Sequence, residues 1–325
     1  MDTSKAPRPA GIGEDPPLVA LLLAFAAIYF IWGSTYLAIR FAIETMPPLG
    51  MAAGRFLIAG MLMYAWARWR GAPHPTLDQW KVGAISGSLL LAGGNGAVVV
   101  AEQWVPSGLV ALLVATVPLW MVVLDATFVS HLKPSVSETS GLIVGFLGVG
   151  LLAGSPGVGG GGPEELFGAV LVLGGSLCWA IGSLVSRYVE NLPRPTMLVA
   201  TQMLSGSAVF AILSLGLGEY DSFTLSRVSS RSWWAFVYLV IAGGLIGYAA
   251  YIWLLTVVPP SRVGTYAYVN PVVAMLLGWS MAGEPLTFRS GLAAVIILAS
   301  VVVITTRPNR KMARSVGQAS EEWTT

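Results

Sequence analysis

Four polar side chains stand within long apolar stretches of the chain, where they could do chemistry away from water: Arg55, Asn95, Glu102 and Asn270. A guanidinium or an amide at such a place can bind a polar group of a small molecule, and a carboxylate can carry a proton or a cation. Structural roles stay open beside these. Arg55 could pair with carbonyls or a carboxylate, Asn95 could serve close packing among its neighbouring glycines, and Glu102 could be a solvated residue at a rim.

Aromatic residues are the second kind of candidate. Tyr266 and Asn270 lie four positions apart and so share one face of a helix, and Tyr248 and Tyr251 lie three apart behind a glycine-rich stretch. A ring with one polar tip suits an amphipathic organic ligand, but such rings also collect at membrane interfaces. Both readings stay open for these tyrosines. Trp233, at the start of an apolar segment, is typical of an interface residue.

The composition indicates which solvent surrounds these residues. The chain has 325 residues, of which 55% are hydrophobic and only 10% are charged, and its mean hydropathy is +0.73. Soluble proteins carry about 25% charged residues. Apolar runs of about 20 residues suit helices that cross a hydrocarbon layer about 30 Å thick. The sequence therefore predicts an all-α integral membrane protein, with the lipid bilayer as its partner.

Several function classes are excluded on the same grounds. A net charge of +2 is too small to indicate a nucleic-acid partner. One cysteine and two histidines leave no metal-binding spacing, so we expect no metal and no cofactor. The phosphate-binding loop of ATPases and the usual protease and hydrolase motifs are absent from the sequence. We therefore expect a protein that is not an enzyme.

Ten apolar segments predict ten transmembrane helices. A tail at 1–17, a glycine-rich linker at 155–165 and a basic tail at 307–325 flank or separate them. The predicted helices cover residues 18–39, 48–67, 82–101, 107–128, 138–154, 166–186, 196–217, 232–255, 262–282 and 288–306.

An internal sequence repeat divides these helices into two halves, 18–154 and 166–306. At an offset of 147 positions, Trp32 meets Trp179, Arg40 meets Arg187 and Pro48 meets Pro195. Five helices in each half is an odd number, so the two halves must lie in opposite orientations. Inverted repeats of this kind are frequent in secondary transporters, which bind their substrate between the halves near the middle of the membrane.

Loop charges predict the orientation. With a cytoplasmic N-terminus, thirteen lysine and arginine residues fall on the inner side and four on the outer side, where the four are Arg40, Arg227, Arg231 and Arg289. Because positive loops stay in the cytoplasm, we expect both termini there. The first apolar segment is too long for a signal peptide and is expected to remain as a helix. We therefore expect a multi-pass protein of the cell (inner or plasma) membrane.

Four stretches resemble the EamA-type drug/metabolite transporters: WGSTYLAIRFAIE from Trp32, the Pro48…Arg55-Phe56 pattern, residues 95–120 and residues 270–287. The resemblance covers about residues 18–306. It implies ten helices as two EamA-like repeats, and export or exchange of small metabolites. One departure concerns a glutamate that ends the fourth helix in the family, as Gly283-Glu284 does after the ninth. This chain has Ser130-His131 there, so the glutamate is missing or is replaced by Glu138.

If the family's arrangement holds, the repeated tryptophans and residues of the third, fourth, eighth and ninth helices surround one cavity near the membrane centre. We expect a substrate-binding set of Trp32, Asn95, Trp120, Trp179, Tyr251, Tyr266 and Asn270, with Arg55 and Glu102 as coupling or structural charges.

The function expected from this is a gradient-driven secondary carrier for a small organic metabolite or an amphipathic drug-like solute. A membrane sensor or scaffold that keeps the carrier fold is the alternative. The substrate, the direction of transport, the coupling ion and the oligomeric state stay open.

Overall fold

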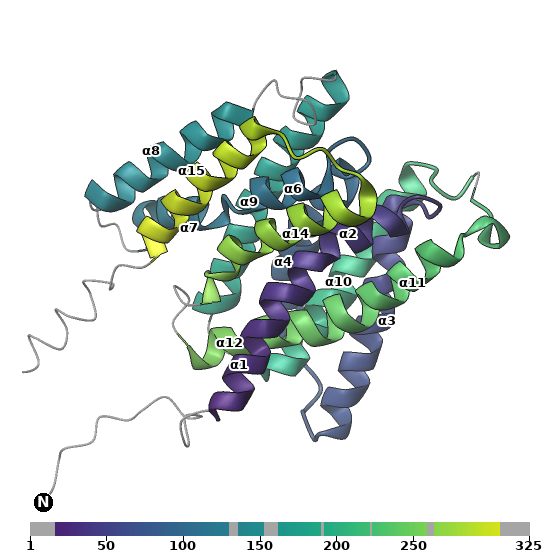
Figure 1. Cartoon of the computed structure of the whole chain (residues 1–325). Coiled ribbons are helices and arrows are strands. Elements are labelled where there is room, and N and C mark those ends of the chain that lie inside the picture. Colours follow the sequence, from purple (N-terminus) through teal and green to yellow (C-terminus); the bar gives the residue numbers. More distant parts are fainter. Residues whose placement is uncertain are drawn as a thin grey trace, which may run out of the picture.

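The structure, a computed structural model, describes residues 17–129, 136–152, 162–189, 192–221, 223–258 and 263–305. Within these ranges the chain is helical and contains no strand (Figure 1). His131, most of the predicted linker and nearly all of both predicted tails lie outside the described residues.

Several helices contain a π-helical segment, in which backbone hydrogen bonds join residues five positions apart and not four as in an α-helix. The first half consists of α1 (Leu18–Ala26), η1 (Ala27–Ile31), α2 (Trp32–Ala42), α3 (Pro48–Trp69), α4 (Leu77–Gly87), η2 (Ser88–Asn95), α5 (Gly96–Ala101), α6 (Ser107–Val114), α7 (Val117–Leu124), η3 (Asp125–Val129) and α8 (Val136–Leu152). The second half consists of α9 (Pro163–Tyr188), α10 (Pro195–Gly216), η4 (Leu225–Arg227, a 3₁₀ turn), α11 (Ser230–Tyr238), η5 (Leu239–Tyr248), α12 (Ala249–Val257), α14 (Tyr266–Ala282) and α15 (Phe288–Thr305).

Seven helices of the described chain are long and apolar enough to cross a membrane. They are Leu18–Ala42, Pro48–Trp69, Leu77–Ala101, Ser107–Phe128, Pro163–Ser186, Pro195–Gly216 and Ser230–Leu254, and three shorter apolar helices are Thr139–Leu151, Val269–Ala282 and Phe288–Val303. The count of ten membrane crossings stays a prediction.

The third span begins five residues before its predicted start at residue 82. Thr76 accepts a hydrogen bond from the backbone N–H of Gln79 at 3.3 Å, and the Gln79 side chain accepts from the backbone N–H of Thr76 at 3.1 Å. This capping box satisfies two backbone donors that a helix start leaves free, and it fixes Leu77 as the first helical residue.

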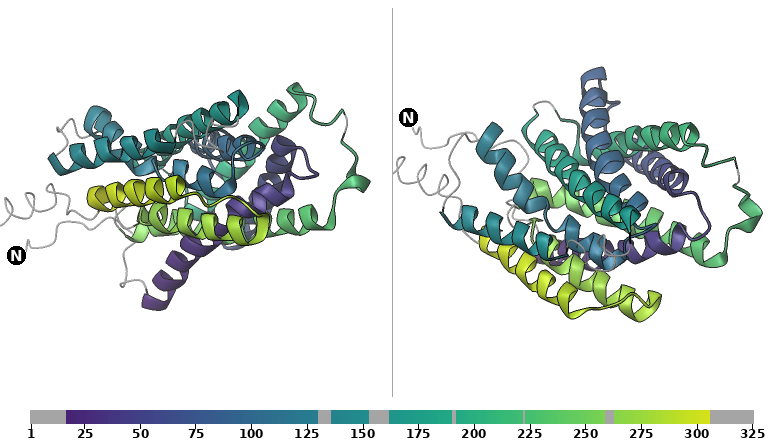
Figure 2. Two further views of the ribbon diagram at one scale, coloured as in Figure 1. Left: turned by 45° about the horizontal axis from the view of Figure 1, so that its top comes forward. Right: turned by 90° about the horizontal axis from the view of Figure 1, so that it is seen from above.

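Helices at the same place in the two halves pack against each other. α3 lies along α10 and α8 lies along α15, and the last two are side by side in Figures 1 and 2. Both pairs run antiparallel. Gly50 near the start of α3 lies against Tyr220 beyond the end of α10, and Gly145 on α8 lies against Ser300 near the end of α15. Antiparallel pairing of equivalent helices is the arrangement that inverted repeats require.

Two glutamates of the second half hold helix starts of the first half. Glu219 accepts the backbone N–H groups of Leu49 at 3.1 Å and Gly50 at 2.8 Å, at the start of α3. Glu284 does the same at the start of α6, for Ser107 at 2.7 Å and Gly108 at 3.1 Å. A carboxylate stabilises a helix N-terminus because it satisfies free N–H groups and complements the helix dipole. We call this end of the bundle, which contains Glu219 and Glu284, the glutamate end.

Further polar contacts gather at the glutamate end. Arg40, near the end of α2, donates to the backbone carbonyl of Glu102. Arg231 at the start of α11 lies 3.4 Å from the carboxylate of Glu44 and stacks over the ring of Phe41. These contacts join α2, α5 and α11, so this end of the bundle is tied across both halves.

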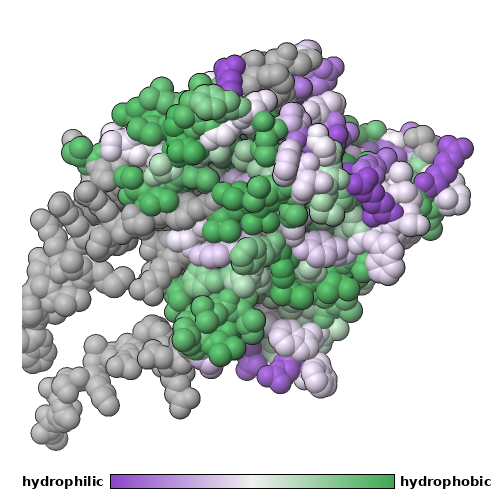
Figure 3. Space-filling model, viewed as in Figure 1, coloured by the Kyte–Doolittle hydropathy of each residue, from purple (hydrophilic) through white to green (hydrophobic). Residues whose placement is uncertain are grey.

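The surface between the polar ends is apolar. In Figure 3 hydrophobic residues cover most of the face in view, and hydrophilic residues collect mainly at its upper right edge and at its bottom. Large apolar side chains such as Leu62, Leu147 and Ile212 are exposed on the molecule. In a bilayer such side chains contact lipid tails, so their exposure on the protein surface carries no free-energy penalty.

We predict that close helix contacts depend on particular glycines, and Gly87 offers a test. A Cβ atom at Gly87 would lie 2.4 Å from the backbone carbonyl oxygen of Gln202, whereas one at Gly174 would meet open space. Gly87→Ala should therefore lower the stability by about 1–3 kcal/mol, because backbone must move. Gly174→Ala, the matched control, should raise it by about 0.5–1 kcal/mol. Thermal unfolding in one detergent measures both, and equal melting temperatures for the two variants would contradict the packing described.

Candidate functional site

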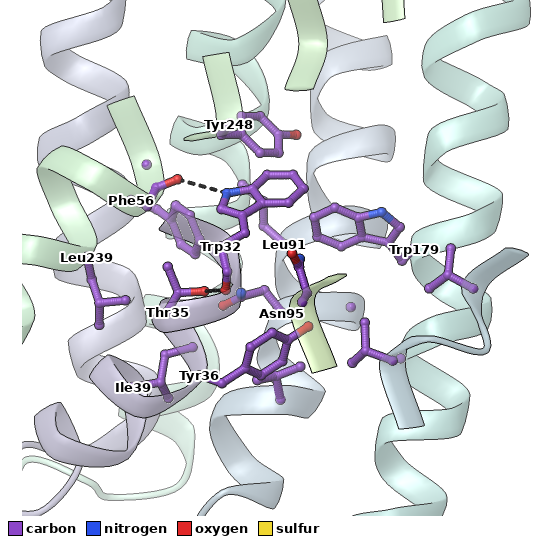
Figure 4. A pocket seen from close by; sticks show the side chains of 18 of the residues that line it. Trp32, Thr35, Tyr36, Ile39, Phe56, Leu91, Asn95, Trp179, Leu239 and Tyr248 are labelled. Carbon is purple, nitrogen blue, oxygen red and sulfur yellow. Dashed lines mark hydrogen bonds between the residues drawn. The ribbon is translucent and has the colours of Figure 1, made fainter. Parts of the chain in front are cut away.

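The indole of Trp32 lies at the centre of the bundle. Trp32 is the first residue of α2, directly after the π-helical turn η1. Its Nε1 atom donates to the backbone carbonyl of Gly243 at 3.2 Å (Figure 4). A Cβ atom at Gly247 would lie 2.6 Å from the same nitrogen. Only glycine at position 247 leaves room for the indole. The close packing of η5 against Trp32 therefore depends on this glycine.

Four aromatic rings surround this indole. Measured between ring centroids, Trp32 lies 5.0 Å from Tyr251, 5.5 Å from Tyr266, 5.9 Å from Trp179 and 6.4 Å from Tyr248. The contacts with Trp179 and Tyr266 are edge-to-face, a favoured arrangement worth about 0.5–1.5 kcal/mol each. Trp32 and Trp179, which the internal repeat relates to each other, thus meet at one place.

A cavity with an empty volume of about 760 Å³, part of it open to solvent, adjoins these rings. Both halves of the chain line it, from α2, α3, η2, α5, α6 and α7 on one side and α9, η5 and α14 on the other. Its mostly apolar wall, which carries a few polar groups, is typical of sites that bind small organic molecules. Its polar and aromatic lining residues are Trp32, Thr35, Tyr36, Arg55, Phe56, Asn95, Ser176, Trp179, Tyr248, Tyr266 and Asn270.

Arg55 is a buried cation in this wall. Its guanidinium donates to the side-chain oxygen of Asn95 and lies 4.4 Å from the centre of the Phe56 ring. Within the described residues it has no carboxylate at salt-bridge distance, and its Nε atom has no hydrogen-bond partner. A buried donor without a partner costs about 1–3 kcal/mol. Arg55 can therefore gain from a hydrogen-bond acceptor that enters the cavity.

Gln202, at the position equivalent to Arg55 in the second half, has a different environment. It is fully buried, and its Nε2 atom donates to the hydroxyl groups of Ser86 and Ser186, both at 2.9 Å. Its Oε1 atom accepts from the Tyr248 hydroxyl at 2.7 Å. With these groups paired inside the bundle, Gln202 holds α4, α9, α10 and η5 together and does not line the cavity. The two equivalent positions therefore differ in role.

Asn270 both lines the cavity and holds α14 to the first helix. With its amide nitrogen facing η1, it donates to the backbone carbonyls of Ile28 and Tyr29 at 2.9 Å each. A π-helical turn can leave such carbonyls available. The Tyr29 hydroxyl and the Thr265 hydroxyl lie 2.6 Å apart, which adds a second link.

The structure brings together five of the residues predicted from the sequence in the cavity wall: Trp32, Asn95, Trp179, Tyr266 and Asn270. Tyr251 stands behind this wall, with its ring against four residues that line the cavity.

Trp120 does not line the cavity. Its ring packs edge-to-face on Phe146 of α8, with centroids 5.3 Å apart, because α8 lies on that side of α7. Glu102 is buried just beyond the wall and does not reach it.

Some lining residues were missed from the sequence. The signal for Tyr36 was its position four residues after Trp32, which puts both side chains on one face of a helix. Thr35 and Ser176 gave no signal, because small hydroxyl side chains are common in membrane helices and usually bond to the preceding turn. Both do so here, with Thr35 donating to the carbonyl of Trp32 at 2.6 Å and Ser176 to that of Val172 at 2.9 Å.

Comparisons with known proteins agree with this architecture. The chain matches the model of the EamA-like transporter family twice, over residues 18–154 and 166–306. It is 41% identical over 290 residues to the uncharacterized inner membrane transporter YedA of Escherichia coli K12, covering 89% of this chain and 91% of that protein. It is 26% identical over 298 residues to the uncharacterized transporter YvbV of Bacillus subtilis, covering 92% and 95% of the two chains.

A solved crystal structure aligns with a TM-score of 0.62 over 88% of this chain and 97% of its own, at 21% identity, which is a likeness of fold. The two family matches span nearly all of the described helices, and the related proteins carry the names of membrane transporters rather than of enzymes. The chain therefore belongs to the EamA-like transporter family, within the drug/metabolite transporter superfamily.

Proposed function

We propose that this protein is a secondary carrier that moves a small organic metabolite or an amphipathic drug-like solute across the cell membrane by alternating access, through export or exchange driven by a gradient. The observation that carries the proposal is the central cavity, which both repeats line and in whose wall Trp32 and Trp179 are in contact. A site shared between two halves can open to either side when the halves move against each other.

The wall of the cavity supports an amphipathic solute. Aromatic rings from Trp32, Trp179 and Tyr266 offer apolar area, while Arg55 and Asn95 offer a few polar groups on one side. A small hydrated ion would lose its water shell to such a wall without enough compensation. A solute with an apolar body and one hydrogen-bond acceptor fits both parts.

The contacts at the glutamate end support a state in which one gate is closed. By the count of loop charges this end is the outer side, because only four of the lysine and arginine residues counted, Arg40, Arg227, Arg231 and Arg289, belong to it. On this proposal, the hydrogen bonds of Glu219 and Glu284 with the starts of α3 and α6 would break and re-form in each transport cycle.

We expect the purified protein in liposomes to move solute without ATP. A panel of labelled amino acids, amphipathic cations and nucleoside-like compounds should reveal at least one solute whose uptake changes with an imposed ion or solute gradient. Empty liposomes are the control. A complete lack of transport by folded protein across the panel would favour the sensor or scaffold alternative.

Variants of the cavity wall test the site. Tyr266→Ala removes a ring that contacts both Trp32 and Tyr251, so transport should fall about tenfold or more, which corresponds to about 1.4 kcal/mol. Trp233→Ala is the matched control, because this half-exposed ring packs on Phe236 away from the cavity and should leave the apparent affinity unchanged. Both variants need a melting temperature near that of the native protein. Normal transport by Tyr266→Ala, with altered affinity in Trp233→Ala, would place the pathway elsewhere.

A further inference from the structure

Glu102 is a fully buried carboxyl group that the cavity does not use. It follows α5 directly, at the glutamate end, and its relative exposure is 0%. Both carboxyl oxygens lack a hydrogen-bond partner in the described part of the chain. Buried polar groups are nearly always paired, so an orphaned carboxyl group needs an explanation.

The position of Glu102 between two openings gives the first part of that explanation. On the α5 side, Val98 lines the central cavity and Gln103 lines a second pocket at the surface. On the α2 side, Tyr36 lines the central cavity and Arg40 lines the same surface pocket. The chain around α5 and helix α2 therefore each extend from the central cavity to the surface pocket, and Glu102 lies between these two pockets. The carboxyl group lies in the partition that separates them.

Within the part of the chain that the structure describes, Glu102 has charged neighbours but forms no ion pair with them. Arg40 from α2, Arg55 from α3 and Glu284 from the turn after α14 act on the carboxyl group electrostatically. Arg40 donates a hydrogen bond to the backbone carbonyl of Glu102, and Arg55 donates one to the side chain of Asn95. Glu284 is bonded to the start of α6.

The remaining neighbours are not charged. Tyr36 of α2 interacts electrostatically with Glu102, and Gly168 of α9 lies against Ala101, the residue before Glu102. The carboxylates of α9 closest in sequence, Glu164 and Glu165, lie about one helical turn before Gly168.

A carboxylate without donors in an apolar place costs several kcal/mol, whereas its neutral acid form costs much less. When the glutamate end is closed, as in this structure, the acid form is therefore favoured. Water that enters when this end opens would stabilise the charged form instead. Closing the glutamate end and binding a proton at Glu102 thus favour each other, and by linkage each changes the equilibrium of the other equally.

We propose that Glu102 is a proton-binding site that links the closing of the glutamate end to the proton gradient. The carboxylate takes one proton from water when this end is open and keeps it as the neutral acid while this end is closed. No other bond is made or broken. The inference rests on the proposed carrier function only where it concerns solute movement.

The first test measures the proton itself and needs no solute. Infrared spectra of the full-length protein in liposomes, recorded against pH, should contain the carbonyl band of a neutral carboxylic acid that persists above the pH at which exposed carboxyl groups lose theirs. Glu102→Gln, which imitates the neutral acid and should fold, should remove this band. Glu102→Asp should retain a titrating band. Glu164→Gln, an exposed glutamate, is the matched control and should leave the band unchanged.

The second test uses a solute that the liposome panel identifies. The ratio of its uptake with and without a pH gradient should differ from one in the native protein and in Glu164→Gln, and should fall to about one in Glu102→Gln. A persistent acid band in Glu102→Gln, or an unchanged ratio, would overturn the proposal. If the native protein moves no solute, the carrier function fails, and the infrared band still decides whether Glu102 binds a proton.

Discussion

The packing of the Trp32 indole is the interaction on which the helix arrangement around the central cavity depends. The indole bonds to the backbone of Gly243 and touches four aromatic rings, and the repeat places its equivalent, Trp179, among them. Such an assembly requires close helix approach, which Gly247 permits beside the indole. In lipid, where apolar area between helices drives association only weakly, packing of this kind is the main source of cohesion. All of these rings except that of Tyr251 then line a cavity.

The buried polar side chains fall into two groups, those whose hydrogen bonds stabilise the bundle and those that keep unpaired atoms near the cavity. Gln202 is paired on both its nitrogen and its oxygen, and Glu219 and Glu284 cap helix starts, so these residues stabilise the bundle. Arg55 and Glu102 instead keep atoms that have no partner among the described residues, at or beside the cavity. Membrane interiors tolerate such groups where a ligand, a proton or a change of state satisfies them. This contrast is the physical basis of the carrier and proton-site proposals.

Much of the helix order followed from the sequence, because apolar length is a local property. The repeat also indicated that Trp32 and Trp179 are equivalent, and the structure places them in contact. The hydrogen-bond partners of Glu219 lie about 170 residues away in the chain, so no local sequence pattern predicts them. Trp120 was misplaced for the related reason that its position on the helix did not reveal which neighbour, α8, its ring would meet.

The most direct test of the central claim follows the accessibility of Ser176, a buried residue of the cavity wall. A Ser176→Cys variant, made in a Cys178→Ala background that removes the single native cysteine, can be treated with a membrane-impermeant thiol reagent in right-side-out and in inverted vesicles. Alternating access predicts that the thiol reacts from both sides of the membrane and that the transported solute slows both reactions. Reaction from one side only, or rates that the solute leaves unchanged, would contradict a central cavity that opens to each side in turn.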